Sequence, residues 1–171
     1  MTIGTLGVGG VLSLRTDNTT PDQSFIARIL QMAKLKGTNY ALLEVSSHSI
    51  VQKRIKNLAF NVFCFTNLSQ DHLDYHKDME TYFHAKLSIL DMLSLDTTII
   101  VNIDDEYGKI FLAKAKDKGF KIETIGFSDT ADIKLRVTQV TSEIQFIEII
   151  RGKFFYAFQT HLIGAFQAIN I

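Results

Sequence analysis

Short apolar segments alternate with helix signals along the first 126 residues, and this order constrains the fold more than any other feature. Strands are predicted at Tyr40–Val45, Val62–Thr66, Thr98–Asn102 and Ile122–Gly126, and the first of them is expected to be buried. Strands separated by helices favour a parallel sheet, because a parallel connection needs a crossover that a helix normally supplies. The sequence therefore predicts an α/β fold with a largely parallel sheet and helices on both of its faces.

Capping residues mark the expected helices. A threonine followed by a proline at Thr20–Pro21 predicts the start of the first helix, which should end at Gly37. Asp78 can cap a second long helix that reaches about Leu93. Shorter helices are expected at residues 49–55 and 106–118.

The two ends of the chain follow other patterns. Residues 133–140, 143–150 and 154–160 alternate in polarity with period two, which predicts an antiparallel meander turning at Arg151–Gly152. At the start, a strand at Thr2–Leu6 should lead through a glycine-rich turn at residues 7–10 to a second strand at Val11–Leu14. Residues 162–171 read as the beginning of a helix.

Composition narrows the class of protein. A length of 171 residues suits one domain, here residues 1–171 as a whole. Lys plus Arg and Asp plus Glu number 18 each, so no net field favours nucleic acid as a partner. Apolar runs are too short for a membrane span and no leader is visible, so we expect a cytoplasmic protein. The single cysteine, Cys64, is predicted to be buried and inert.

Polar side chains gather where two predicted strands end, which is where α/β proteins build their sites. Glu44 ends the first of these strands, and a carboxylate there can meet a metal or a phosphate, or can form a salt bridge. Ser46 and Ser47 can bind a ligand or cap a helix, and His48 is more typical of a structural histidine. The next strand is followed by residues whose types can hold Mg²⁺, Mn²⁺ or Zn²⁺: Asn67, Asp71, His72, Asp74 and His76.

Two further side chains, Arg54 and Lys86, have two interpretations each. Gln52 and Arg54 follow on a short helix, and the planar fork of Arg54 suits a carboxylate, although a solvated surface arginine is equally ordinary. Lys86 lies close to the apolar stripe of its helix. A lysine there can extend to water, or it can be partly buried with a lowered pKa and capture CO₂ as a carbamate.

These stretches together resemble the middle, ATP-binding domain of the Mur ligases, in particular of those that add the third residue to UDP-N-acetylmuramoyl-L-alanyl-D-glutamate. The most specific match is the run from Thr66 to His76. The other matching stretches occur in family order: Gly4–Gly7, Thr19–Pro21, Glu44–Arg54, Met79–Glu80, Ala85–Lys86, Asn102–Asp105 and Gly164–Asn170. The resemblance implies a Rossmann-like, P-loop NTPase-like central domain.

The resemblance also implies roles for single residues. ATP would activate a substrate carboxylate as an acyl-phosphate, and an amino acid would then form the amide. Glu44 would bind Mg²⁺ at the ATP phosphates, while His72 and a carbamylated Lys86 would hold a second Mg²⁺. The remaining implied contacts are with the UDP-muramoyl dipeptide, through Thr19, Thr20, Ser46, Gln52 and Arg54, and with adenine, through Asn170.

Departures from the family pattern leave alternatives open. No G-x-x-x-x-G-K-[ST] phosphate loop is present, Gln167 stands where an adenine asparagine is usual, and Gln70 replaces a common arginine. Without the loop, and without the N-terminal and C-terminal domains of the family, residues 1–171 alone are expected to be inactive. The alternatives are a related folylpolyglutamate synthetase, a metal-dependent hydrolase, and a non-catalytic module that binds muramyl peptide or nucleotide.

Overall fold

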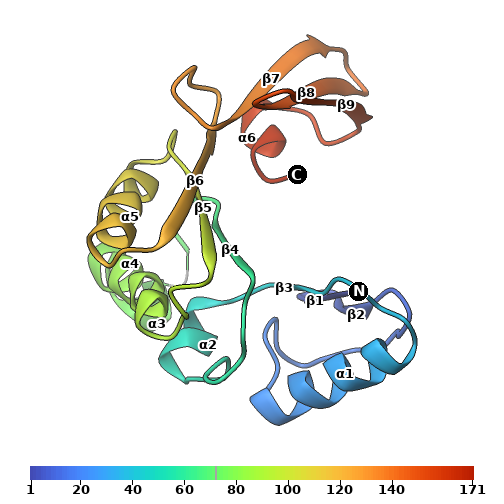
Figure 1. Ribbon diagram of the computed structural model, residues 1–171, viewed down its shortest axis with the longest axis vertical. Helices are drawn as coiled ribbons and strands as arrows, with labels where there is room; N and C mark the ends of the chain where they lie inside the picture. Colours follow the sequence, from blue (N-terminus) through green and yellow to red (C-terminus); the bar gives the residue numbers. More distant parts are fainter. Residues whose placement is uncertain (72) are drawn as a thin grey trace. The chain divides into compact units, whose positions relative to one another are not determined.

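A computed structural model describes residues 1–71 and 73–171. The chain divides into two compact units. The first unit comprises residues 1–59 and 72–93, and the second comprises residues 60–71 and 94–171. Each unit is described by itself below, with the element labels of Figure 1.

The first unit holds a small three-stranded sheet in the order β2-β1-β3. Strand β1 (Thr2–Gly4) pairs antiparallel with β2 (Gly7–Gly9) and parallel with β3 (Leu42–Leu43). Helix α1 (Gln23–Leu35) lies beside this sheet (Figure 1). Its apolar face packs against the sheet to form a buried core of four residues: Ile3, Val8, Ile26 and Ile29.

Several predictions for this unit are wrong in detail. The segment expected to be a glycine-rich turn is largely strand β2, and the chain reverses earlier, at residues 5–6. The sequence did not reveal this strand, because glycines leave no polarity pattern from which a strand can be recognised. Strand β3 is only two residues long, and Leu42 is 70 % exposed rather than buried. Among the described residues, β3 is the last strand of its sheet, so no strand of that part of the chain pairs with its outer edge. The predicted end of α1 at Gly37 is close to the observed C-cap, Lys36.

The remaining regular elements of the first unit are helical. Helix α2 (Ser47–Val51) is followed by α3 (Leu73–His76), α4 (Met79–Leu87) and a 3₁₀ turn, η1 (Ser88–Asp91). The prediction that Asp78 caps α4 is confirmed, since its side chain accepts a hydrogen bond from the Thr81 N–H at 2.7 Å. The predicted helix to Leu93 is divided between α4 and η1.

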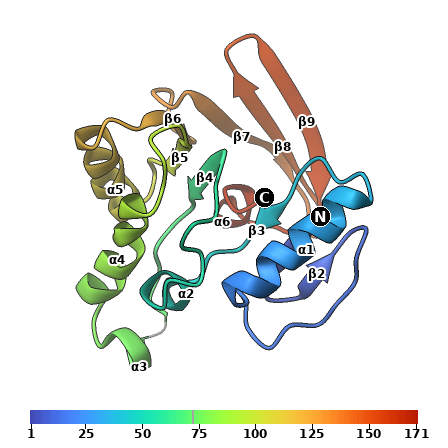
Figure 2. The ribbon, with the colours of Figure 1, turned by 60° about the horizontal axis from the view of Figure 1, so that its bottom comes forward.

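The second unit is built on a six-stranded sheet in the order β4-β5-β6-β7-β8-β9. Strands β4 (Val62–Phe65), β5 (Thr98–Asn102), β6 (Lys121–Gly126) and the start of β7 run parallel. Helix α5 (Glu106–Asp117) lies along this part of the sheet (Figure 2). Its Phe111 is fully buried and stacks on Phe65, with 4.6 Å between the ring centroids. The predicted α/β class is confirmed.

The predicted meander is also confirmed. Strands β7 (Ile133–Val140), β8 (Gln145–Arg151) and β9 (Phe154–Thr160) pair antiparallel in sequence order. The predicted C-terminal helix is reduced to one short turn, α6 (Ala165–Ala168), which lies beside β7 and β8 (Figure 1). Among the described residues, no helix is long and apolar enough to cross a membrane.

Cys64 corrects another prediction. It lies on β4, the first strand of its sheet, and its residue is exposed rather than buried. Its side chain points away from the α5 face, which Phe63 and Phe65 occupy because residues alternate along a strand. Desolvation by neighbouring groups nevertheless raises the pKa of the thiol, which keeps it protonated at neutral pH.

Candidate active site

Glu44 lies just after β3, and its carboxylate is tied to the turn between β1 and β2. Both the Thr5 N–H and the Thr5 hydroxyl donate to Oε2, at 2.9 Å and 3.0 Å. The Thr5 hydroxyl also lies 3.2 Å from the Thr19 hydroxyl. A Cβ on Gly4 would come within 2.6 Å of Oε2, so this glycine allows the close approach. The carboxylate is thus oriented at a strand end while the residue stays exposed.

Thr20 does not cap α1 as predicted. The N-cap of α1 is Asp22, and Thr20 is fully buried. Its hydroxyl donates to the Glu44 carbonyl at 2.7 Å and accepts from the Ser46 N–H at 3.0 Å. A buried hydroxyl needs such partners, and these bonds join the segment before α1 to the end of β3.

Ser46 is the N-cap of α2, as one of its two interpretations predicted. Its hydroxyl accepts a hydrogen bond from the Ser49 N–H at 3.2 Å, and the Ser49 hydroxyl donates to the Ser46 carbonyl at 2.6 Å. The cap fixes the chain directly after the Glu44 strand end. Gln52, the C-cap of α2, is exposed.

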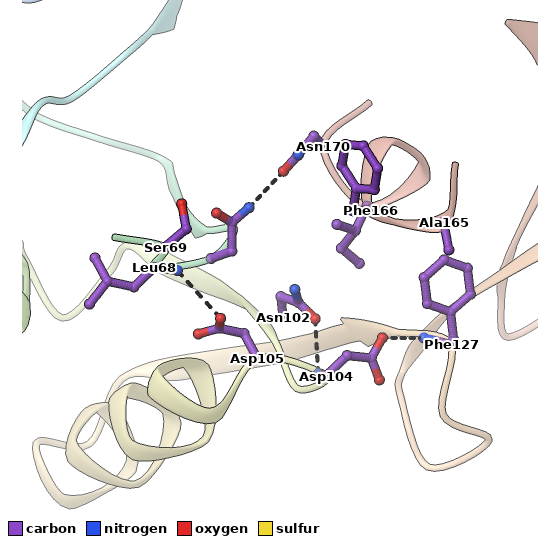
Figure 3. A pocket seen from close by; sticks show the side chains of 11 residues that line it. Leu68, Ser69, Asn102, Asp104, Asp105, Phe127, Ala165, Phe166 and Asn170 are labelled. Carbon is purple, nitrogen blue, oxygen red and sulfur yellow. Dashed lines mark hydrogen bonds between the residues drawn. The ribbon is translucent and has the colours of Figure 1, made fainter. Parts of the chain in front are cut away.

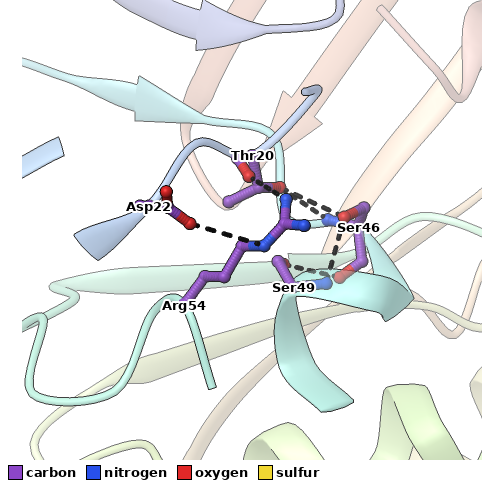
Figure 4. Close-up of polar contacts among 5 residues, drawn as sticks. All are labelled: Thr20, Asp22, Ser46, Ser49 and Arg54. Atoms are coloured by element: carbon purple, nitrogen blue, oxygen red, sulfur yellow. Dashed lines mark hydrogen bonds and ion pairs between the residues drawn. The ribbon is translucent and has the colours of Figure 1, made fainter. Parts of the chain in front are cut away.

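Arg54 joins the same group of polar contacts (Figure 4). Its Nη1 donates to the Thr20 carbonyl at 2.8 Å, and its Nε lies 3.9 Å from Oδ1 of Asp22. The Arg54 side chain is only 17 % exposed, so it is not the solvated surface arginine of the simpler interpretation. Three of the predicted substrate contacts, Thr20, Ser46 and Arg54, therefore lie together, linked through Thr20.

Two histidines of this unit, His48 and His76, form part of its packing. His76 is 3 % exposed, and its Nε2 lies 2.8 Å from the Ser47 hydroxyl. Its ring stacks on Tyr82, with 4.9 Å between centroids, while His48 lies against Tyr75 at 4.1 Å. His76, considered above as a metal ligand, here joins α3 to α2. Among residues 1–71 and 73–171, no group of three His, Cys, Asp or Glu side chains could hold a metal ion.

Lys86 is half-buried on α4, as its predicted position beside the apolar stripe required. Its Nζ lies 5.3 Å from the centroid of the Tyr82 ring, within the range of a cation–π contact. His72, the other predicted ligand of a second metal, lies outside the described residues. The proposed pairing of these two side chains therefore stays a prediction.

The second unit contains a pocket of about 420 Å³ beside the ends of β4, β5 and β6 (Figure 3). Asn170, which follows α6, reaches across it, and its Oδ1 accepts a hydrogen bond from Nδ2 of Asn67 at 2.7 Å. Aromatic rings and carboxylates complete its wall. The lining residues are Asn67, Leu68, Ser69, Asn102, Asp104, Asp105, Phe127, Ala165, Phe166, Ile169 and Asn170.

The acidic loop after β5 is fixed by its own hydrogen bonds. Asn102 donates to the Thr66 carbonyl at 2.7 Å and accepts from the Asp104 N–H at 2.9 Å. Asp104 in turn accepts from the Phe127 N–H at 2.7 Å. Asp105 caps α5 through the Gly108 N–H, so its role is partly structural. These contacts hold the Asp104 carboxylate at the pocket wall.

Sequence reasoning identified Asn170 as a site residue but missed most of its neighbours. Phe127 and Phe166 are exposed aromatic residues on loop and helix ends, with no local motif that indicates a ligand. Asp104 lay in a stretch that matched the family without an assigned role. Gln167 does not line the pocket, so it does not replace the missing asparagine there.

Comparisons with known proteins agree with this architecture. The model of the Mur ligase middle domain matches residues 1–171. A UDP-N-acetylmuramoyl-L-alanyl-D-glutamate–2,6-diaminopimelate ligase of Parabacteroides distasonis is 38% identical over 158 residues, which cover 91% of this chain and 31% of that protein. The chain thus spans about a third of the length of this relative.

Solved structures give the same result. A structure of a UDP-N-acetylmuramoyl-L-alanyl-D-glutamate–2,6-diaminopimelate ligase matches with a TM-score of 0.81 and 27% identity, covering 99% of this chain and 35% of that one. The MurF ligase of Thermotoga maritima in complex with ADP shares the fold, with a TM-score of 0.56 and 14% identity, over 82% of this chain and 33% of that one. Since the family model matches the whole chain, the protein belongs to the Mur ligase family through its middle domain.

Proposed function

We propose that residues 1–171 are the middle domain of an ATP-dependent ligase that adds 2,6-diaminopimelate to UDP-N-acetylmuramoyl-L-alanyl-D-glutamate. The observation that carries the proposal is the match of the whole chain to the Mur ligase middle domain. The choice of amino acid is supported by the names of relatives that are 35–38% identical over more than nine-tenths of this chain. Because the proposed reaction consumes ATP, we place the protein in the cytoplasm as part of this proposal.

The proposed reaction has two steps. A carboxylate oxygen of the muramyl dipeptide attacks the γ-phosphorus of ATP, and ADP leaves. The neutral amino group of diaminopimelate then attacks the acyl carbon and gives up one proton, and inorganic phosphate leaves as the amide forms. The first step brings a carboxylate to the anionic phosphates, and the second builds negative charge on the acyl oxygen and the leaving phosphate, so the protein must supply positive charge and exclude water.

We assign nucleotide binding to the pocket of the second unit. Its volume of about 420 Å³ is in the range of small-molecule sites. The amides of Asn67 and Asn170 can donate to and accept from a base edge, and the ring of Phe166 offers an apolar face. The Asp104 carboxylate can accept hydrogen bonds from ribose hydroxyls. The ADP complex of the Thermotoga relative supports nucleotide binding by this fold.

Glu44 is the proposed ligand of Mg²⁺ at the phosphates. Mg²⁺ prefers hard oxygen donors and usually keeps one or two carboxylates together with phosphate oxygens and water. An exposed carboxylate at a strand end, held by Thr5, whose hydroxyl also contacts Thr19, fits that requirement. When bound, the ion neutralises charge on the transferred phosphoryl group.

Lys86 is the proposed site of a carbamate. Its side chain is half-buried, and its Nζ lies 5.3 Å from the centroid of the Tyr82 ring, so the amine lies at the edge of the apolar interior. Together with His72 it would hold a second Mg²⁺. Thr19, Thr20, Ser46, Gln52 and Arg54 are the proposed contacts of the muramyl dipeptide.

The test is a reconstituted assay on the polypeptide that contains residues 1–171. We expect ADP and phosphate release that requires Mg²⁺, the muramyl dipeptide and diaminopimelate together, with the tripeptide product seen by mass spectrometry. Lysine in place of diaminopimelate should give little product. Ester or phosphate-ester hydrolysis without ATP would support the hydrolase alternative instead. Tight nucleotide or peptide binding without turnover would support the binding module.

A further inference from the structure

Gln145 is a fully buried amide on β8, in a strand whose other inward residues are apolar. Its Nε2 donates to the carbonyls of Leu162 and Gly164, at 2.6 Å and 3.3 Å. Its Oε1 accepts from the Gly164 N–H at 3.2 Å. A buried amide is costly unless it is hydrogen-bonded, and here both ends of the amide bind one short segment.

That segment is the turn that starts α6. Gly164 has φ 114° and ψ 146°, a left-handed conformation that favours glycine. A Cβ at this position would lie 3.0 Å from Cε1 of Phe166. Helix α6 is four residues long, far too short to be stable by itself, so its position depends on tertiary contacts.

The α6 segment carries Phe166 and Asn170 to the pocket of the second unit (Figure 3). Gln145 does not line that pocket. It acts on the pocket only through the backbone of residues 162–164 and the short helix that follows. The Asn170 amide then meets Asn67 at 2.7 Å.

We propose that Gln145 is a positioning residue for nucleotide binding, which fixes the Gly164 turn and so holds Asn170 and Phe166 at the pocket. This inference rests on the proposed function of the pocket. It differs from a purely structural role, because loss of the amide should affect nucleotide binding more than the binding of the other substrates or the stability of the sheet.

The experiment compares Gln145→Met with Gln159→Met, which makes the same replacement on an exposed position of the adjacent strand β9. In the polypeptide containing this chain, affinity for a non-hydrolysable ATP analogue should fall about tenfold in Gln145→Met. It should stay within about twofold of the parent in Gln159→Met. The KM values for the muramyl dipeptide and diaminopimelate should change little in either variant.

Hydrogen exchange tests the positioning without any ligand. The amides of residues 165–170 should exchange faster in Gln145→Met, and those of β5 and β6 should not. Unchanged exchange together with unchanged nucleotide affinity would overturn the proposal. If the parent binds no nucleotide, the proposed function fails, while the exchange result still decides whether Gln145 orders α6.

A second variant covers the case in which Gln145→Met does not fold. Gly164→Ala strains the same turn from outside the sheet and should weaken nucleotide binding in the same way. If both single variants fold, the variant with both substitutions should bind the nucleotide no more weakly than the more affected single variant, because both substitutions act through the same turn. Fully additive losses would contradict a shared path.

Discussion

Asn67 donates from Nδ2 to Oδ1 of Asn170 at 2.7 Å, although 103 positions separate the two residues in sequence. One amide follows β4 and the other follows α6, so the bond joins the parallel part of the second unit to the segment after the meander. An asparagine amide has two N–H donors and a carbonyl with two lone pairs. Each side chain therefore keeps further groups with which to meet a base.

Asn170→Ala should weaken ATP binding about tenfold, because it removes polar groups from the pocket and also the partner of Asn67. Asn67→Ala should have a similar effect, and the double variant should lose less than the sum of the two singles. Titration of a non-hydrolysable ATP analogue measures this. Gln167→Ala is the matched control, because Gln167 lies on α6 without lining the pocket. Equal losses of nucleotide affinity in the three single variants would mean that α6 as a whole is disturbed.

Glu44→Gln should lower activity by about a hundredfold or more and raise the Mg²⁺ concentration needed for half-maximal rate, since it removes a metal-binding charge. The neutral amide can still accept hydrogen bonds from Thr5, so folding should be unaffected. Rates measured across a Mg²⁺ series test this. Glu80→Gln, an exposed glutamate on α4 of the same unit, is the control. An unchanged Mg²⁺ requirement in Glu44→Gln would argue against the assignment.

Elements with a strong local pattern were predictable from the sequence. The start and stop residues around α1 and the alternation of β7–β9 depend on residues close in sequence, and these elements were found near their expected bounds. The N-terminal hairpin was not predictable, because β2 consists of glycines and one valine and its pairing with β1 is decided by tertiary contacts. For the same reason β3 was predicted longer and more buried than it is.

The candidate site divides in a similar way. Glu44 and Ser46 were predictable because a carboxylate and a capping serine at a strand end have local meaning. The buried position of Thr20 was not, since its partners are 24 and 26 residues away. Phe127 follows β6 and Phe166 lies on α6, and both line the same pocket only in the folded chain. No short sequence motif predicts this.

The contact between His76 and Ser47 should stabilise the first unit. His76→Ala removes a buried ring that stacks on Tyr82, and we expect a loss of about 3 kcal/mol in the free energy of unfolding. Ser47→Ala should cost about 1–2 kcal/mol, because it leaves the His76 ring without this partner. Urea denaturation followed by circular dichroism measures both, with exposed Ser24→Ala on α1 as the control. Additive losses in the double variant would show that the two side chains do not interact.

Asp132 links β6 to the start of β7 through Thr124. Its Oδ2 accepts from the Thr124 N–H at 2.9 Å and from the Thr124 hydroxyl at 2.7 Å, and its own N–H donates to that hydroxyl at 2.9 Å. The hydrogen bond from the Thr124 N–H has the largest effect in lowering the pKa of the Asp132 carboxyl, and the hydrogen bond from the Thr124 hydroxyl lowers it further. A carboxyl whose pKa is lowered by folding stabilises the folded state above its unfolded pKa, and the stabilisation is lost as the pH falls through the folded value.

Asp132→Asn should therefore destabilise the protein at pH 7 by about 1 kcal/mol or less, since the carboxylate is exposed to solvent. The difference from the parent should begin to shrink near the unfolded pKa of about 4, and it should be lost as the pH falls through the lowered pKa of the folded state. Free energies of unfolding measured between pH 7 and pH 2.5 test both statements. Asp129→Asn, in the same loop with a mostly exposed ion pair to Lys134, is the control and should show a smaller change. A difference that does not shrink between pH 4 and pH 2.5 would mean that the lost interaction is packing rather than charge-assisted hydrogen bonding.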